Sequence, residues 1–269
     1  EKAPQSPARG LGRFWFGGTG SEVDVRVGEY GVMEGLLHAV IFLPILGAVL
    51  IMLLPGQRPS APRWVAGTVT AVVLLLSLVL FVAFPRGEPG FQFVTKVPWI
   101  PQIGAQYFVG VDGISLPLVV LNALLTFLAV LVSWRLDLRP KEYFSLVLVL
   151  ETAVMGVFTS LDLFLFLLFW ELELAPMYLL IGIWGGPRRE YAAFKFLLYT
   201  VFGSAFMIVG VLGLFFLTGA RTFDLMALRE AAGLLPLATQ VFLFAMLFIG
   251  FAVKLPVFPF HTWLSDAHV

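Results

Sequence analysis

Residues 162–184 read DLFLFLLFWELELAPMYLLIGIW. This stretch is long enough to cross a bilayer, because about 20 helical residues span roughly 30 Å. It nevertheless carries two carboxylates, Glu171 and Glu173, and a proline, Pro176, near its middle. An acid in hydrocarbon costs about 2.5 kcal/mol or more, so it needs a polar partner or a water-filled cavity. Pro176 cannot donate to the carbonyl of Leu172, which predicts a helix break one turn from Glu171. The stretch therefore indicates a site for protons or ions inside a membrane.

The composition of the chain also favours a membrane protein. Of its 269 residues, 59% are hydrophobic and 13% are charged, whereas a soluble domain has about 25% charged residues. The formal net charge is zero, so nucleic acid is not an expected partner. The sequence contains no cysteine, which excludes disulfides and iron–sulfur ligation by these residues. Three scattered histidines do not predict a metal site.

Seven apolar segments have the length of membrane helices. They cover residues 33–54, 64–84, 113–134, 142–160, 162–184, 191–217 and 237–264. We therefore expect an all-α, polytopic membrane protein. Between these segments, residues 85–112 are expected to form a surface loop, and residues 223–232 an amphipathic piece.

The first residues of the chain differ from the rest. Residues 1–32 are rich in Gly, Arg and Pro and lack an apolar run. They do not form a signal peptide, because an apolar core and a small-residue cleavage site are missing. We expect them to be a disordered extension outside the native fold, with Met33 as the start of the native protein. The transmembrane domain then covers residues 33–269.

Basic residues concentrate in alternate loops. The loops after the first, third and fifth segments are short and hold seven bases: Arg58, Arg63, Arg135, Arg139, Lys141, Arg188 and Arg189. The other loops hold fewer bases, mixed with acids. The positive-inside rule puts the base-rich loops in the cytoplasm and the start of the first segment outside.

Two carboxylates are predicted to meet at mid-membrane. Glu151 lies nine residues after Glu142, and Glu171 lies nine residues after Asp162, about 14 Å along each segment. The short turn between these segments makes them antiparallel neighbours. Two close carboxylates in a low dielectric cannot both ionise easily, which suits a proton carrier. A hydrogen-bonded structural pair is the alternative. Glu173 points about 200° away from Glu171, so the two cannot serve one pocket. Glu173 is expected to face a neighbouring subunit or segment, or to have a structural role, and Glu173→Gln is expected to affect proton pumping much less than Glu171→Gln.

The seventh segment contains GFAVKLPVFPFHTWL at residues 250–264. Pro256 and Pro259 remove backbone donors to the carbonyls of Ala252 and Leu255, which predicts a broken helix. Broken helices at membrane depth line cavities and often bind ions.

Lys254 stands beside these prolines. A desolvated lysine can exchange protons, and the adjacent break favours this role over a lysine that snorkels to the surface. His261 is a candidate proton relay, because histidine titrates near neutrality, or a polar residue at a helix end. Lys195 is expected to snorkel towards Arg188 and Arg189.

Four stretches carry a resemblance to a known family: GVDGISLPL at 110–118, FWELELAPMYLLIGIWGG at 169–186, YAAFKFLLYT at 191–200 and GFAVKLPVFPFHTWLSDAH at 250–268. They resemble the antiporter-like M subunit of bacterial NADH–quinone oxidoreductase (complex I). The related D-type subunit of the cyanobacterial and chloroplast NAD(P)H dehydrogenase-like complex is equally similar. The resemblance covers residues 33–269. The family usually has proline where this chain has Ser265, which puts the form of the helix break in doubt.

The resemblance implies specific roles. In the family the glutamate of the FWE motif pairs with the lysine of the VKLP motif, here Glu171 and Lys254, and Glu151 matches a glutamate one segment earlier. It also implies a 14-helix fold built from inverted repeats of five helices, of which this chain would be the truncated first half.

The implied function is that of a proton-translocating subunit of a complex I-type NADH:quinone oxidoreductase. NADH, quinone, FMN and iron–sulfur clusters are expected on other subunits, and no cofactor on this chain. Expected partners are other membrane subunits, lipid and protons. The expected location is the bacterial inner (plasma) membrane, or the thylakoid membrane for the cyanobacterial type. A subunit of a multisubunit Na⁺/H⁺ antiporter or membrane hydrogenase, and a passive membrane scaffold, are the alternatives.

Overall fold

The computed structural model describes residues 31–55 and 60–268. Residues 1–30 of the expected N-terminal extension lie outside the described residues, and residues 31 and 32 belong to the first helix. The helices are α1 (Gly31–Leu53), α2 (Ala61–Ala83), α3 (Ser115–Val132), α4 (Pro140–Thr159), α5 (Leu163–Leu172), α6 (Leu174–Trp184), α7 (Arg189–Thr218), α8 (Leu225–Ala232), α9 (Leu237–Lys254) and α10 (Thr262–His268).

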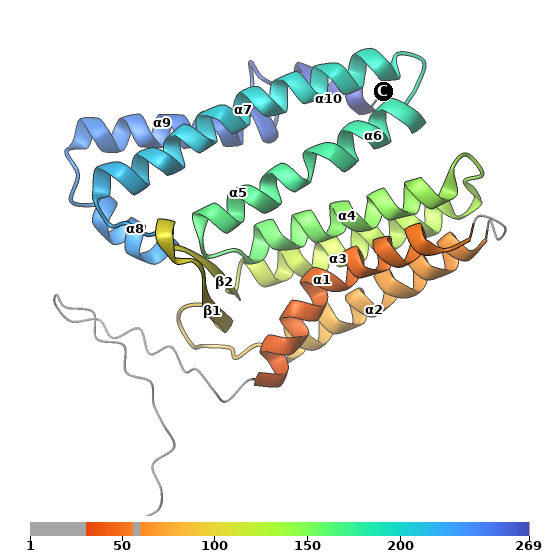
Figure 1. Cartoon of the computed structure of the whole chain (residues 1–269), viewed down its shortest axis with the longest axis horizontal. Coiled ribbons are helices and arrows are strands. Elements are labelled where there is room, and N and C mark those ends of the chain that lie inside the picture. Colours follow the sequence, from red (N-terminus) through yellow and green to blue (C-terminus); the bar gives the residue numbers. More distant parts are fainter. Residues whose placement is uncertain (1–30, 56–59, 269) are drawn as a thin grey trace, which may run out of the picture.

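Seven helical stretches in the described part of the chain have the length and hydropathy of membrane spans, with α5 and α6 together forming one of them. This confirms the predicted polytopic helical fold. The helices form three layers (Figure 1). Helices α1 to α4 pack as a bundle, α5 and α6 lie between α4 and α7, and α9 packs along α7 and also contacts α5.

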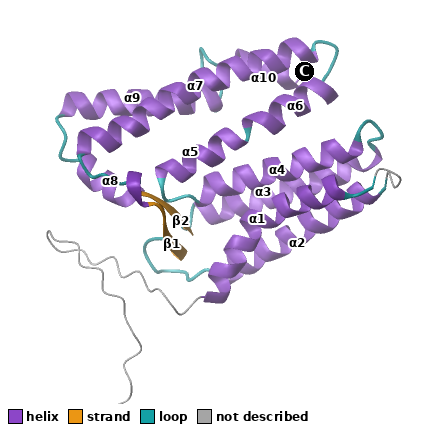
Figure 2. Ribbon diagram, viewed as in Figure 1, coloured by secondary structure: helices purple, strands orange, loops and turns teal. Residues whose placement is uncertain are grey.

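A β-hairpin replaces most of the loop expected on the surface between the second and third segments. Strand β1 (Gln92–Ile100) pairs antiparallel with β2 (Ala105–Val111), with Val97 opposite Tyr107 (Figure 2). Phe93, Val109 and Val111 are buried. The surface prediction was therefore wrong for Phe93 and for most of β2, whereas residues 96–99 of β1 are exposed as expected. The Val, Tyr and Phe residues of the two strands suit a half-buried sheet.

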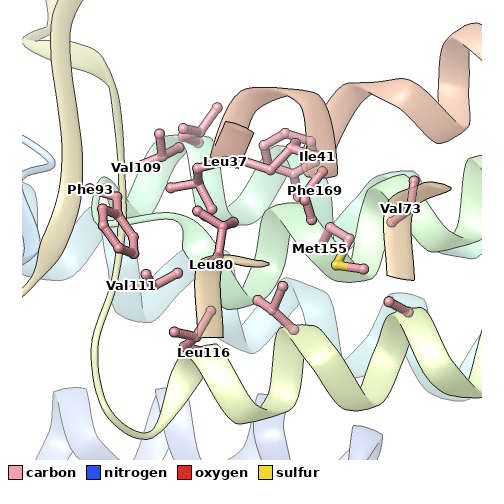
Figure 3. Packing of buried hydrophobic residues seen from close by; sticks show 14 residues of the cluster. Leu37, Ile41, Val73, Leu80, Phe93, Val109, Val111, Leu116, Met155 and Phe169 are labelled. Atoms are coloured by element: carbon pink, nitrogen blue, oxygen red, sulfur yellow. The ribbon is translucent and has the colours of Figure 1, made fainter. Parts of the chain in front are cut away.

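The hairpin closes one end of the main hydrophobic core. Leu37 and Ile41 of α1 pack there with Met155 of α4 and Phe169 of α5, beside the buried valines of β2 (Figure 3). Gly156 lies against the Phe169 ring so closely that a Cβ at Gly156 would overlap the ring. The absence of a side chain there lets α4 and α5 approach each other.

Two aspartates connect the hairpin to the helices. Asp162 caps α5 by accepting hydrogen bonds from Phe164 N and Leu165 N, and it also accepts one from Gln106 N of β2. Asp224 caps α8 in the same way and lies 2.6 Å from Lys96 Nζ of β1. Capping carboxylates satisfy N–H groups that a helix end leaves free. Together they hold α5, α8 and the hairpin at one end of the molecule.

Glycines bring α7 and α9 into close contact. A Cβ at Gly203 would lie 2.8 Å from Val253 Cβ, and one at Gly210 would lie 2.8 Å from Leu247 Cδ2. On the opposing helix, a Cβ at Gly250 would lie 3.0 Å from Met207 Cβ. Small residues at such crossings let backbones approach. This packing fixes the position of Lys254 at the end of α9.

Candidate functional site

The fifth membrane segment is interrupted at Glu173. Helix α5 ends at Leu172 and α6 begins at Leu174, with Glu173 as the residue between them. Pro176 lies in the first turn of α6, where its missing N–H does not cost a helical hydrogen bond. The break predicted from Pro176 is present as a one-residue gap in the helical hydrogen-bond pattern, and Glu173, at this gap, keeps helical backbone angles (φ −68°, ψ −28°).

The seventh segment is interrupted after Lys254. Helix α9 ends there, and α10 begins at Thr262 after turns that contain both prolines. This confirms the predicted break between Lys254 and His261. The carbonyl of Ala252, however, accepts a hydrogen bond from Val257 N at 2.8 Å, so our expectation that it would be free was wrong. The indole N–H of Trp263 donates to the carbonyl of Val253 at 2.8 Å, which satisfies a second acceptor at the end of α9.

Lys254 and Glu173 form an ion pair between the two interruptions. Lys254 Nζ lies 2.8 Å from Glu173 Oε1, and each side chain is 18% exposed. The two atoms are close but not aligned as a hydrogen bond. The ammonium also lies 5.2 Å from the centre of the Trp170 ring, within the range of a cation–π contact. The lysine at the end of α9 suits the dipole of its helix.

This pairing corrects the expectation that Lys254 faces Glu171. Residues 166, 170 and 173 share one face of the fifth segment, and the rings of Phe166 and Trp170 contact Phe251 of α9. Glu173 therefore faces α9, and Glu171, about 200° away around the helix, does not. The sequence signal for Glu173 was its spacing of three residues from Trp170, which puts both on one face.

Carboxylate oxygens of Glu151 and Glu171 are buried without hydrogen-bond partners among the described residues. Glu151 is 1% exposed and both of its carboxylate oxygens lack a partner, as does Oε1 of Glu171. Such groups are rare inside proteins and mark water, ion or proton sites. Helices α4 and α5 are packed neighbours, as predicted. The direct contact between the two carboxylates stays a prediction.

The remaining candidates lie elsewhere. His261 is exposed between α9 and α10, with its ring 5.5 Å from that of Phe258. Lys195, expected to snorkel, instead forms an ion pair with Asp266 of α10 at 2.6 Å. No group of three metal-ligating side chains occurs within residues 31–55 and 60–268.

The seven candidate spans, with charged residues inside them, are typical of a polytopic membrane protein that carries an ion or proton pathway. The family described as "NADH:quinone oxidoreductase/Mrp antiporter, TM" matches residues 160–269, which include both interrupted segments.

More specifically, the chain is similar to NAD(P)H-quinone oxidoreductase chain 4. It is 46% identical over 235 residues to chain 4-2 of Synechocystis sp., covering 86% of this chain and 41% of that protein. Chain 4 1 of Synechococcus elongatus is also 46% identical, with 86% and 43% covered. The chain thus spans less than half the length of these relatives. The predicted resemblance to complex I-type membrane subunits is confirmed.

Solved structures agree with this assignment. A chain in "Respiratory complex I from Thermus thermophilus with bound NADH" superimposes with a TM-score of 0.75 at 31% identity, over 86% of this chain and 46% of that one. A chain of the Mrp complex from Dietzia sp. gives a TM-score of 0.72 at 20% identity, over 88% and 25%. At that identity the Mrp likeness shows the fold alone.

Proposed function

We propose that this chain is a proton-translocating membrane subunit of a complex I-type NAD(P)H–quinone oxidoreductase. The observation that carries the proposal is the Lys254–Glu173 ion pair between two interrupted membrane helices. Charged residues inside membrane segments are expensive and mark ion or proton pathways. The similarity to chain 4 of cyanobacterial NAD(P)H-quinone oxidoreductases supports this reaction over an antiporter that acts alone.

Proton exchange at Lys254 would depend on its counterion. While the pair is closed, the carboxylate of Glu173 stabilises the ammonium and keeps the proton on the lysine. When the pair opens, the desolvated ammonium loses this stabilisation and the proton can leave. The partnerless carboxylates of Glu171 and Glu151 are the proposed acceptors. An interrupted helix can open such a pair with a modest movement.

The redox chemistry would take place elsewhere in the complex. We place NADH or NADPH, FMN, iron–sulfur clusters and quinone on other subunits, with none of them bound by this chain. Its proposed partners are neighbouring membrane subunits, the lipid bilayer and the transported protons. The cyanobacterial relatives favour a thylakoid or plasma membrane location. His261 stays a proposed relay, because it lies in the turns that connect α9 to α10.

A test compares this function with that of a passive scaffold. Lys254→Met, introduced into the full-length protein, keeps much of the side-chain volume and removes the charge. We expect loss of proton uptake by membrane vesicles during electron transfer, with assembly unchanged on native gels. Glu142→Gln is the control, because Glu142 lies at the exposed start of α4 and pairs with Arg139. Normal uptake by Lys254→Met would support the scaffold.

A further inference from the structure

Two buried oxygens, one on α5 and one on α7, lack hydrogen-bond partners among the described residues. They are Glu171 Oε1 and Ser204 Oγ. Ser204 is 4% exposed, and nothing in the function proposed above uses it. Buried polar atoms in proteins almost always have a partner. Two such atoms on adjoining layers of one fold therefore call for a common explanation.

Ser204 lies on the face of α7 that is directed at α5 and α6. Residues 193, 204 and 211 share this face, because 7 and 11 residues are close to two and three helical turns. At one end of the face, Ala193 Cβ lies 3.6 Å from the position of a Cβ built on Gly182 of α6. At the other end, Val211 packs in one hydrophobic cluster with Leu163, Phe164 and Leu167 of α5.

The register of these helices puts Ser204 opposite Glu171. Helix α7 runs antiparallel to α5 and α6, since a short loop connects α6 to α7. Phe164 shares a cluster with Val211 at one end of the contact, and Gly182 lies next to Ala193 at the other end. The two ends are 18 residues apart on both segments, in opposite chain directions. Glu171 follows Phe164 by seven residues, and Ser204 precedes Val211 by seven residues.

The facing surface of α5 also includes Glu171. Phe164, Leu167 and Glu171 follow one another at intervals of three and four residues, which places them on one side of a helix. Phe164 and Leu167 pack against the Val211 cluster. Glu171 thus continues the stripe of α5 that is directed at α7, whereas Glu173 faces α9.

We propose that Ser204 is a positioning residue for Glu171, to which its hydroxyl hydrogen-bonds through one bridging water. A serine hydroxyl both donates and accepts. It can donate to the water when Glu171 is a carboxylate and accept from the water when Glu171 is a carboxylic acid. Ser204 thus keeps the side chain of Glu171 directed at α7 in both protonation states. This inference rests on the proposed function only for the proton-carrying role of Glu171.

A neighbouring hydroxyl on α7 provides a matched control. Thr200 lies one turn before Ser204 and is also 4% exposed. Its hydroxyl donates to the carbonyl of Phe196 at 2.7 Å, so it is already satisfied within its own helix. Thr200→Val removes a buried hydroxyl of the same helix without removing a partner of Glu171.

The test uses the full-length protein in its membrane complex, with Ser204→Ala, Ser204→Cys, Ser204→Thr and Thr200→Val. Infrared difference spectroscopy identifies the carbonyl band of Glu171 as the band lost in Glu171→Gln. We expect Ser204→Ala to shift this band to higher wavenumber and to slow proton uptake roughly tenfold, as expected for one hydrogen bond to a charged group. Ser204→Cys, a weak donor, should give a smaller shift, Ser204→Thr should restore the native band, and Thr200→Val should leave it unchanged.

An unshifted band in both Ser204→Ala and Ser204→Cys would overturn the inference, as would an equal shift in Thr200→Val. The band reports the contact itself and not transport. If Glu171→Gln takes up protons normally while Ser204→Ala still shifts the band, the proton-carrying role of Glu171 fails and the contact stands.

Discussion

Lys254 Nζ lies 2.8 Å from Glu173 Oε1, and the two residues stand at the interruptions of two different membrane helices. Lysine ends α9, and glutamate precedes α6. Lys254 complements the partial negative charge at the end of α9, and its ammonium faces the carboxylate of Glu173 between α5 and α6. This geometry explains why two charged residues are tolerated inside an apolar fold, and it identifies the variants that should be most informative.

Glu173→Gln should reduce proton uptake by about tenfold or more. It removes the charge that stabilises the Lys254 ammonium. Breaking a fully buried ion pair costs about 3–5 kcal/mol, and these side chains are 18% exposed. Proton uptake by vesicles measures the effect, with Glu173→Asp expected to retain part of the activity. The expectation from the sequence alone is a much smaller effect than that of Glu171→Gln. Unchanged uptake in Glu173→Gln would favour that sequence-based expectation.

Gly156→Ala should destabilise the contact between α4 and α5. The added methyl group would overlap the ring of Phe169, and overpacking of a tight core costs about 1–3 kcal/mol. Thermal unfolding of the solubilised complex should show a lower Tm. Gly113→Ala is the control, since no atom lies within 4 Å of the added group. Equal Tm values for both variants would show that the Gly156 contact is loose.

Asp162 should give the stability of the protein a specific pH dependence. Burial raises the pKa of Asp162 above its ordinary value of 3.8, and Asp224 raises it further, against the lowering effect of backbone N–H donors. The folded state therefore binds this proton more tightly than the unfolded state. The free energy of unfolding should fall as pH rises from 3.8 through the raised pKa.

Asp162→Asn removes the titration and retains one acceptor oxygen for the helix cap, while the loss of the bond from Gln106 N is independent of pH. The difference in Tm between wild type and Asp162→Asn should change in favour of the variant as pH rises above 3.8. A difference that stays constant over this range would show that the pKa of Asp162 is not raised.

Lys96→Met should weaken the attachment of the hairpin to α8. The variant removes the 2.6 Å ion pair with Asp224, whose side chain is 10% exposed. The expected loss is about 1 kcal/mol, because Lys96 is 39% exposed and partly screened by solvent. Chemical denaturation of the solubilised complex measures it. Arg139→Met, in an exposed pair with Glu142, should change stability by less than about 0.5 kcal/mol, and a larger effect there would contradict this ranking.

The sequence predicted the membrane helices well because their signals are local. Length and hydropathy located all seven spans, and Pro256 with Pro259 located the interruption after Lys254. The hairpin was missed because β1 contains Pro98, which is unusual in a strand. Its burial depends on α1 and α5, which no local pattern reveals.

The site was predicted in part, for a different reason. Sequence identified the charged residues inside the membrane, but the partner of Lys254 depends on how α5 turns relative to α9. If α5 were rotated about its axis by the angle between two residues, Glu171 would face α9 in place of Glu173. The contacts of Phe251 with the rings of Phe166 and Trp170 fix the orientation that puts Glu173 there. Similarly, Ser204 has no sequence signal of its own, because its place opposite Glu171 follows from the register of α7.

The glycine contacts between α7 and α9 have a mechanical consequence. With Gly203 and Gly210 on one helix and Gly250 on the other, the two backbones leave little room to slide past each other. We therefore expect α7 and α9 to move together as one rigid unit, with Lys254 at the end of α9. The interruptions beside Glu173 and after Lys254 are the natural hinges of this unit. We expect that a small joint rotation of α7 and α9 would change the Lys254–Glu173 distance while the bundle of α1 to α4 stays in place.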